Sequence, residues 1–488
     1  MSAPSTTDSN KQKGGVPDAP IQVLSTMTND GKRRWLYPVL SKGKHFWRRL
    51  AVAVGLIALF LALPVVHVGG NPAVFLDVIH REFHFFGLTL YPTDTILLMV
   101  FLLLSLLGVF ILTAFLGRVW CGWGCPQTVY LEFVFRPIER LIEGREMQRK
   151  RRDEGPWNFD KIWRKGAKWG IFAAIAIFLS HAFLAYFVSW DSLLAWMGGS
   201  PGEHFGVFFA MLLVSGLIFF DFAYFREQMC TITCPYARLQ SALQDKDSMI
   251  VAYDPNRGEP RGRRTRELRK KEKAGLDIPL GDCIDCGACV RTCPTGIDIR
   301  EGLQMECIAC TQCIDACNGI MEGIGKPHGL IRYSSEHAIE DNKPTRIIRP
   351  RTIAYGLVWT ALLSAFVWML AGREPLHVDV GRIPGAPFTM IDDDSVANRV
   401  RFRMRNQTGE KATFHIEPIT PKSAEVKVVG QPDIVLDHGE MRRVETFVVA
   451  PKADFGADGQ IDSQFRVVGP DGIEQVVDFT LMGPSKQL

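Results

Sequence analysis

Residues 283–294 read CIDCGACVRTCP, and residues 307–318 read CIACTQCIDACN. Both runs have the spacing C-x-x-C-x-x-C-x-x-x-C, which is typical of a ferredoxin-type module that holds two 4Fe-4S clusters. In such modules the last cysteine of each run binds the other cluster. We therefore predict two sets of cluster ligands: Cys283, Cys286, Cys289 and Cys317 for the first, and Cys307, Cys310, Cys313 and Cys293 for the second. A pair of zinc sites is the alternative, but runs of three cysteines plus one fit cubane clusters better than zinc.

The other cysteines of this chain form two shorter motifs. Residues 117–132 read GRVWCGWGCPQTVYLE, and residues 225–240 read FREQMCTITCPYARLQ, so each contains C-x-x-x-C-P after an arginine. Pro126 and Pro235 suit the first position of a helix, and each biases the cysteine before it away from the helical conformation. Each motif therefore predicts a break in the chain followed by a new helix, and its recurrence indicates two repeated helical hairpins.

The thiols of these two motifs converge on one site if the hairpins pack side by side: Cys121, Cys125, Cys230 and Cys234. Such a set suits a soft or borderline metal, and the candidates are Cu(I), zinc and an additional iron-sulfur cluster. A reversible disulfide and ordinary buried cysteines are the alternatives. We expect Arg118 and Arg226 to lower the pKa of the nearby thiols and to favour thiolates. Electron transfer to a bound metal or a third cluster is the interpretation we favour.

Apolar residues are unevenly distributed along the chain. They make up 47% of it, and they gather in stretches near the roughly 20 residues that a membrane-spanning helix requires. We predict five spans, at residues 50–68, 95–116, 169–188, 206–225 and 353–370. Lysine and arginine are frequent before the first span and after the second, and scarce after the first and third. By the positive-inside rule the amino terminus and all cysteine motifs lie in the cytoplasm, and the carboxyl terminus lies outside.

The segments that follow the last span change to a period of two. Val400, Phe402 and Met404 alternate with arginines, and similar alternation recurs around residues 414–416, 426–428 and 465–467. Short strands separated by Pro, Gly and Asp turns indicate an Ig-like β-sandwich. Because it contains no cysteine, we interpret this part as an interaction module.

The predicted fold class is therefore a multi-domain membrane protein. It has an α-helical transmembrane bundle of five spans, a cytoplasmic two-cluster ferredoxin-like insertion and a C-terminal Ig-like β-sandwich. The predicted parts are a disordered cytoplasmic tail (1–30), a four-helix transmembrane region with the C-x-x-x-C-P motifs (31–226), the ferredoxin-type domain (227–349), the fifth transmembrane helix (350–372) and an outward-facing sandwich (373–488).

A strongly basic stretch approaches the ferredoxin motifs. Residues 256–273 read NRGEPRGRRTRELRKKEK, in which nine of eighteen residues are basic. A basic segment next to a membrane favours contact with anionic lipid headgroups over nucleic-acid binding, so we expect membrane lipid as a partner and no nucleic acid. A docking surface for an acidic cytoplasmic electron donor is a further interpretation.

The combination of CGWGCP, CTITCP, CIDCGACVRTCP and CIACTQCIDACN with a further span and a sandwich resembles the CcoG/FixG/RdxA family of cytochrome c oxidase accessory proteins. The resemblance covers nearly the whole chain. It implies a protein of the bacterial inner membrane, with a periplasmic sandwich, that assists assembly of a haem-copper oxidase as a cytoplasmic cupric reductase. It also implies copper chemistry at Cys121, Cys125, Cys230 and Cys234, and partners such as a copper chaperone, a copper-transporting ATPase and oxidase subunits.

Two other functional classes are compatible with these motifs. One is a quinol-linked membrane electron carrier, because polyferredoxin subunits of nitrate and nitrous oxide respiration also combine paired C-x-x-x-C-P motifs with two ferredoxin repeats; the sandwich argues against it. The other is a redox sensor or assembly scaffold without turnover. In the interpretation we favour, a cytoplasmic donor reduces the two clusters, and single electrons then reach Cu(II) at the four paired cysteines, whose soft sulfur ligands favour Cu(I).

Overall fold

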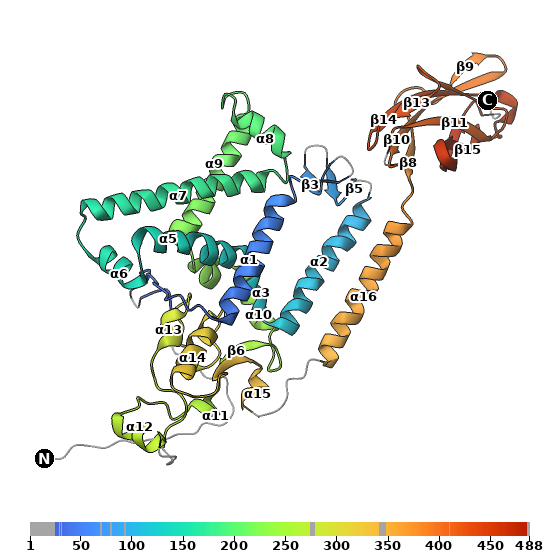
Figure 1. The fold of residues 1–488 in the computed structure, drawn as a ribbon. Helices are drawn as coiled ribbons and strands as arrows, with labels where there is room; N and C mark the ends of the chain where they lie inside the picture. The colour runs from blue at the N-terminus through green and yellow to red at the C-terminus, as the bar shows by residue number, and fades with distance from the viewer. Residues whose placement is uncertain are drawn as a thin grey trace. The chain divides into compact units, whose positions relative to one another are not determined.

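The computed structural model describes residues 25–485, apart from residues 29, 31, 69–70, 79–80, 92–93, 274–278, 341–347 and 409 (Figure 1). Most of the tail predicted at residues 1–30 therefore lies outside the described residues. The chain divides into two compact units: the first comprises Met1–His67, Pro72–His84 and Met99–Leu362, and the second comprises Val68–Asn71, Phe85–Leu98 and Leu363–Leu488.

Five helices in the described part of the chain are long and apolar enough to cross a membrane, as predicted. They are α1 (Lys44–Ala62), α2 (Thr95–Leu116), α7 (Phe159–Leu184), α9 (Phe205–Phe220) with its π-helical continuation η3 (Asp221–Phe225), and α16 (Pro350–Ala371). The short strands β1 (His67–Val68), β2 (Asn71–Pro72), β3 (Val74–Asp77), β4 (Glu82–Phe85) and β5 (Leu88–Leu90) lie between α1 and α2, and helix α8 (Trp190–Met197) lies between α7 and α9.

Two of the predicted spans differ from the structure by more than three residues at both ends: α1, predicted at 50–68, and α7, which was predicted at 169–188 and ends at Leu184. Helix α1 starts at Lys44 and ends at Ala62, so the prediction of 50–68 was wrong at both ends. Leu63 still has helical backbone, but Pro64 has no backbone N–H to donate, so the helical hydrogen-bond ladder cannot continue through it. Helix α7 begins at Phe159 rather than 169, since the Asn158 side chain caps its first turn by accepting a hydrogen bond from the Lys161 amide (2.8 Å). Hydropathy alone misses both starts because the first turns are charged.

Short helices follow each C-x-x-x-C-P motif, as its proline predicts. Helix α4 (Pro126–Tyr130) has Pro126 at its first turn, and helix α10 (Pro235–Leu243) has Pro235 there. The cysteines before them have extended backbone, with ψ of 126° at Cys125 and 111° at Cys234. The neighbouring elements are α3 (Val119–Trp123), η2 (Leu131–Phe135), α5 (Arg136–Glu143), α6 (Glu146–Glu154) and η4 (Met229–Thr233).

The ferredoxin-type module lies between α10 and α16 in the chain. Strand β6 (Ile250–Tyr253) pairs antiparallel with β7 (Ile331–Ser334), and short helices α13 (Ala288–Thr292) and α14 (Gln312–Gly323) follow the two cysteine loops. Buried apolar residues, among them Ile314 and Leu330, form its core. The remaining elements are α11 (Pro255–Gly258), α12 (Arg266–Lys273), η5 (Ile299–Glu301) and α15 (Glu336–Glu340).

The segment before α1 contacts this module; we call the described residues of 25–43 the N-terminal strap. The Ser25 hydroxyl donates to the Thr295 carbonyl (2.6 Å), and the Val39 amide donates to the Arg291 carbonyl (2.9 Å). At the start of α1, the Asp315 carboxylate on α14 accepts from the Phe46 amide (2.8 Å). The module is therefore attached to the first membrane helix by a side chain that satisfies the unpaired amides of its first turn.

The C-terminal strands form two sheets, which agrees with the predicted Ig-like sandwich. One sheet has the order β12-β14-β10-β8 with β9 paired to β10, and the other has the order β13-β11-β15-β16. Val400, Phe402 and Met404 are fully buried on β10, so the alternation with arginines marks the inner face. The strands are β8 (Leu376–Arg382), β9 (Thr389–Asp392), β10 (Ser395–Asn406), β11 (Ala412–Thr420), β12 (Glu425–Val428), β13 (Ile434–Leu436), β14 (Met441–Pro451), β15 (Gln460–Val468) and β16 (Glu474–Met482).

Candidate electron-transfer site

The eight ferredoxin-type cysteines surround two small cavities. One is lined by the first predicted ligand set, Cys283, Cys286, Cys289 and Cys317. The other is lined by the second predicted set, Cys293, Cys307, Cys310 and Cys313. Cys289 lines both cavities, so the two lie next to each other. Each cavity is thus lined by the four cysteines of one predicted set, with Cys289 lining the second cavity as well. Which cysteines hold which cluster stays a prediction.

The two cysteine loops share an unusual backbone conformation. Asp285 and Gly287 have φ of 52° and 64° in the first loop, and Ala309 and Thr311 have φ of 51° and 61° in the second. Residues with positive φ curl a loop so that successive amide groups turn toward its centre, which makes an anion-binding concavity of the kind found at iron-sulfur sites. Two copies of this arrangement within one module indicate two similar sites.

The chemistry of these donors fits 4Fe-4S clusters. Burial raises the pKa of the Cys307 thiol to about 11 and that of Cys310 to about 12, although Arg118 and Arg49 respectively oppose the shift. Thiols buried in this way need a positively charged metal to become thiolates. Among the described residues no three His, Cys, Asp or Glu side chains are grouped closely enough to hold one metal ion. At least four cysteines line each cavity, which is the number of ligands that a 4Fe-4S cluster requires.

The two C-x-x-x-C-P hairpins pack side by side. The Arg118 guanidinium donates to the Ala237 carbonyl (3.0 Å), and Gln127 donates to the Asp221 carboxylate (3.1 Å). The Cys121 thiol donates to the Gln240 side-chain oxygen (3.4 Å). These contacts bring together the partly buried thiols of both motifs: Cys121, Cys125, Cys230 and Cys234. Among the described residues, no three of these thiols form a group that could hold one metal ion.

Of the two arginines expected to activate these thiols, Arg118 does lower the pKa of Cys121, but not enough to favour the thiolate. Burial raises the pKa of Cys121 to about 12 and outweighs the opposite effect of Arg118. Arg226 instead forms a two-pronged ion pair with the buried Glu139 carboxylate, at 2.9 and 3.0 Å. That pair holds the pKa of Glu139 at about 2, against the effect of burial. The Cys121 thiol is therefore protonated at neutral pH unless a metal ion binds it.

The four-cysteine site lies directly against the ferredoxin loop that contains Cys307 and Cys310. A Cβ atom on Gly122 would lie 2.6 Å from the Ile308 carbonyl oxygen and 2.7 Å from that of Ala309, closer than real Cβ contacts allow. Only glycine permits this approach. The main chains of CGWGC and CIAC are thus in direct contact.

Side chains reinforce this contact between the two loops. The Trp123 indole donates to the Tyr333 hydroxyl (2.8 Å), which donates to the Ala309 carbonyl (3.3 Å). Arg49, a buried residue of α1, donates from Nε to the Gly122 carbonyl (2.9 Å). Its two terminal nitrogens have no hydrogen-bond partner among the described atoms.

Comparison with known proteins adds evidence on the whole chain. Protein RdxA from Cereibacter sphaeroides is 34% identical over 445 residues, which cover 87% of this chain and 92% of RdxA. The chain belongs to the FixG/RdxA family. The nitrogen fixation protein FixG from Rhizobium meliloti is 30% identical over 488 residues, covering 90% of each chain. This confirms the resemblance drawn from the cysteine motifs.

Sequence models of three domain families also match this FixG/RdxA family member. They are a 4Fe-4S dicluster domain at residues 225–336, a 4Fe-4S binding domain at residues 98–145 and the IG-like fold at the C-terminal of FixG at residues 366–484. A crystal structure of a FixG-related protein from Vibrio parahaemolyticus matches 22% of this chain and 97% of that one, with 12% identity and a TM-score of 0.18. The protein is thus a FixG-like iron-sulfur electron-transfer protein with apolar helices typical of a membrane protein.

Several residues at this site were not anticipated from the sequence. Gly122 lies inside a predicted motif, and a glycine between two cysteines is the signal that could have drawn attention to it. Arg49 directly precedes the first predicted span. In the sequence it was only one of the basic residues that indicate the orientation of that span. Trp123 and Tyr333 are 210 residues apart, so nothing local links them.

Proposed function

We propose that this protein is a cytoplasm-facing cupric reductase of the bacterial inner membrane that supports assembly of a haem-copper cytochrome c oxidase. A cytoplasmic donor supplies electrons to the ferredoxin-type module. At the four-cysteine site one electron converts one Cu(II) to one Cu(I), with no bond formed or broken. The 4Fe-4S clusters, when bound, supply one-electron transfer. The β-sandwich is then periplasmic, and oxidase subunits, a copper chaperone and a copper-transporting ATPase are the expected partners.

The observation that carries this proposal is the main-chain contact between Gly122 and the loop of Ile308 and Ala309. It places the loop of Cys121 and Cys125 against the loop of the second cluster-ligand set. No side chain separates the two main chains at this point. Electrons that reach the module therefore have a short path to the cysteines of the membrane hairpins.

The residues of the four-cysteine site also favour the reduced product. Thiol sulfur is a soft donor, and soft donors select Cu(I) over Cu(II). The four cysteines are neither fully buried nor exposed, which leaves access for an ion and limits the access of water. We propose that copper is bound there transiently, as a substrate.

A third 4Fe-4S cluster at these cysteines is the second candidate for the site. One observation favours it: the matching 4Fe-4S binding domain at residues 98–145 includes Cys121 and Cys125. In that case copper is reduced elsewhere on the protein. The two candidates differ in the iron content they predict.

The deciding experiment is anaerobic reduction of Cu(II) by purified, cluster-loaded protein, with Cu(I) trapped by a chromogenic chelator. The double variant Cys121→Ser/Cys230→Ser is compared with the wild type. Thr231→Ala/Thr233→Ala is the matched control, because it changes two residues of the same CTITCP loop and keeps every thiol. EPR spectra and iron content are measured on all three proteins.

The proposal predicts that copper reduction is lost in the cysteine variant and kept in the control, with unchanged EPR signals and iron content. Equal rates in the cysteine variant and the wild type would assign copper reduction to other sites and contradict the proposal. A loss of about four iron atoms per chain in the cysteine variant would show a third cluster instead.

A further inference from the structure

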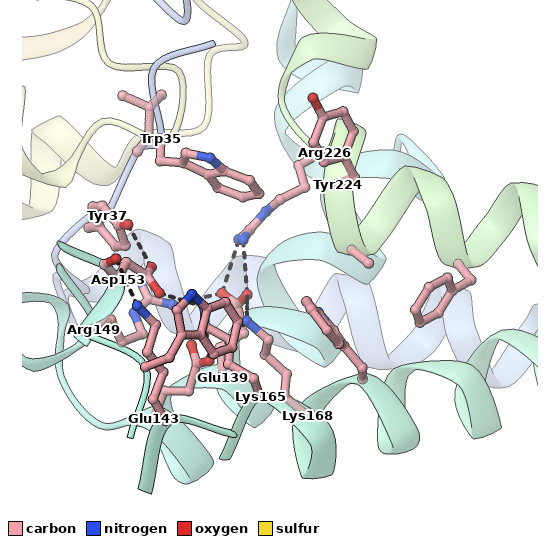
Figure 2. A pocket seen from close by; sticks show the side chains of 16 residues that line it. Trp35, Tyr37, Glu139, Glu143, Arg149, Asp153, Lys165, Lys168, Tyr224 and Arg226 are labelled. Carbon is pink, nitrogen blue, oxygen red and sulfur yellow. Dashed lines mark hydrogen bonds and ion pairs between the residues drawn. The ribbon is translucent and has the colours of Figure 1, made fainter. Parts of the chain in front are cut away.

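A cavity of about 570 Å³ is lined by residues of α5, α6 and α7, within the first compact unit (Figure 2). Its walls come from these helices, from the end of α9 with η3, and from Trp35 and Tyr37 of the N-terminal strap. The volume is in the range of sites for small molecules, roughly 300–1,000 Å³. None of the proposed redox chemistry uses this cavity.

One wall of the cavity carries more positive than negative charge. Its carboxylates are Glu139, Glu143 and Asp153, and its five cations are Arg149, Lys161, Lys165, Lys168 and Arg226. Each carboxylate is already ion-paired with residues of this set, as Figure 2 shows. Two positive charges remain in excess, so the wall favours an anion.

Of these five cations, Lys161 is the one that forms no ion pair with the three carboxylates. Its ammonium donates to the carbonyls of Gly155 (2.7 Å) and Asp153 (3.0 Å) and lies 4.8 Å from the centre of the Trp157 ring. An ammonium has three protons, and these two contacts use two of them. The third is available to an acceptor inside the cavity.

The apolar part of the lining belongs to two candidate membrane helices. Trp169 on α7 and Phe219 and Ala223 at the end of α9 form it. Tyr224 and Trp157 lie at the rim and are 51% and 67% exposed. Tryptophan and tyrosine gather where a membrane meets water. The cavity thus offers charged and apolar lining residues, which suit a ligand that lies at the boundary between membrane and water.

We propose that this cavity binds one anionic phospholipid, with its phosphate against the cations near Lys161 and its acyl chain along Trp169, Phe219 and Ala223. The proposal rests on the membrane placement argued above, but not on copper reduction. Inorganic phosphate would leave the apolar part of the lining without a partner.

A quinol fits the cavity less well than a phospholipid. Its oxidation requires a group that accepts its protons, and the carboxylates here are held by cations. Both oxygens of Glu139 accept hydrogen bonds from Arg226, which helps to hold the pKa of Glu139 at about 2. A carboxylate with so low a pKa is a poor base at neutral pH.

The test uses full-length, cluster-loaded protein in detergent, titrated with phosphatidylglycerol and followed by native mass spectrometry. The variants are Lys161→Gln, which removes the charge, and Ala223→Trp, which fills the apolar side and keeps the charge. Lys150→Gln is the matched control: it removes a lysine from α6 that is exposed, pairs with Glu154 and lies outside the cavity. Unchanged cluster EPR signals establish that each variant is folded.

We expect Lys161→Gln to weaken phosphatidylglycerol binding about tenfold, the effect of losing one charge-assisted hydrogen bond. Ala223→Trp should weaken it as well, and Lys150→Gln should not. Zwitterionic phosphatidylcholine and inorganic phosphate should bind the wild type more weakly.

Three results would overturn the proposal. They are equal affinity for the two lipids, wild-type affinity in both cavity variants, and displacement of the lipid by decylubiquinol with reduction of the clusters. The last would identify a quinol site. Because lipid affinity is the readout, any of these results leaves the copper experiment to decide the proposed function separately.

Discussion

Replacing Gly122 by alanine tests the contact between the two cysteine loops. The added Cβ would lie 2.6 Å from the Ile308 carbonyl oxygen, whereas ordinary contacts begin at 3.4 Å, so the loops must separate by about 0.8 Å. Both obstacles are main-chain atoms, which cannot rotate away. Such overpacking costs about 1–3 kcal/mol. Since a misplacement of about 1 Å can cost on the order of 100-fold in rate, we expect copper reduction to slow by about ten- to 100-fold.

The assay is a single turnover of prereduced protein with Cu(II), with EPR signals recorded before mixing. Gly124→Ala is the matched control in the same CGWGCP motif. Its Cβ would meet the Trp120 ring at 2.5 Å, but this side chain is 48% exposed and can turn aside. We expect the control to keep a rate near that of the wild type. A wild-type rate in Gly122→Ala, with the clusters intact, would refute the electron path.

Three further predictions concern other parts of the chain. Arg49→Gln should lower the midpoint potential of the cluster at Cys310 by tens of millivolts, because a nearby positive charge favours the reduced cluster; an EPR redox titration measures it. Glu139→Gln should cost about 3–5 kcal/mol of stability in thermal unfolding, because it leaves Arg226 buried and without its main partner. Since the pKa of Glu139 falls from 4.5 to about 2 on folding, its stabilisation is complete above pH 4.5 and is lost as pH falls through 2. Phe402→Ala should cost about 3–5 kcal/mol in the unfolding of the sandwich and leave the cluster EPR signals unchanged.

Each of these predictions has a control and a contradicting result. Arg48→Gln on the same helix should not change the potential, and an equal shift in both variants would point to a general effect of net charge. Glu154→Gln removes an exposed carboxylate that pairs with Lys150 and should change stability by less than about 1 kcal/mol. Phe447→Ala removes a phenylalanine of the same sandwich that is 40% exposed; a loss as large as that of Phe402→Ala would contradict the assignment of the core.

Features set by short spacing could be predicted from the sequence. Pro126 and Pro235 determine where α4 and α10 begin, because a proline acts on its own residue and the one before it. The alternation around Phe402 gives the inner face of β10, because side chains of a strand point to opposite faces in turn. The two cysteine-lined cavities of the ferredoxin-type module follow in the same way from the geometry of one compact loop.

Features that depend on distant packing could not be predicted. The docking of the start of α1 against Asp315 joins residues about 270 positions apart. The pairing of Arg226 with Glu139 joins residues 87 positions apart, and it removes the arginine from the role that its nearness to Cys230 indicated. The cavity beside Lys161 is likewise built from the strap and four separate helical segments, none of which is distinctive alone.

The N-terminal strap imposes an order on how the protein is made. The Ser41 amide and the His45 imidazole bond to Gln312 and Asp315, which are 271 and 270 residues further along the chain. A ribosome must therefore complete four of the predicted spans and both cysteine runs before these bonds can form. Until then the strap and the first turn of α1 lack these partners.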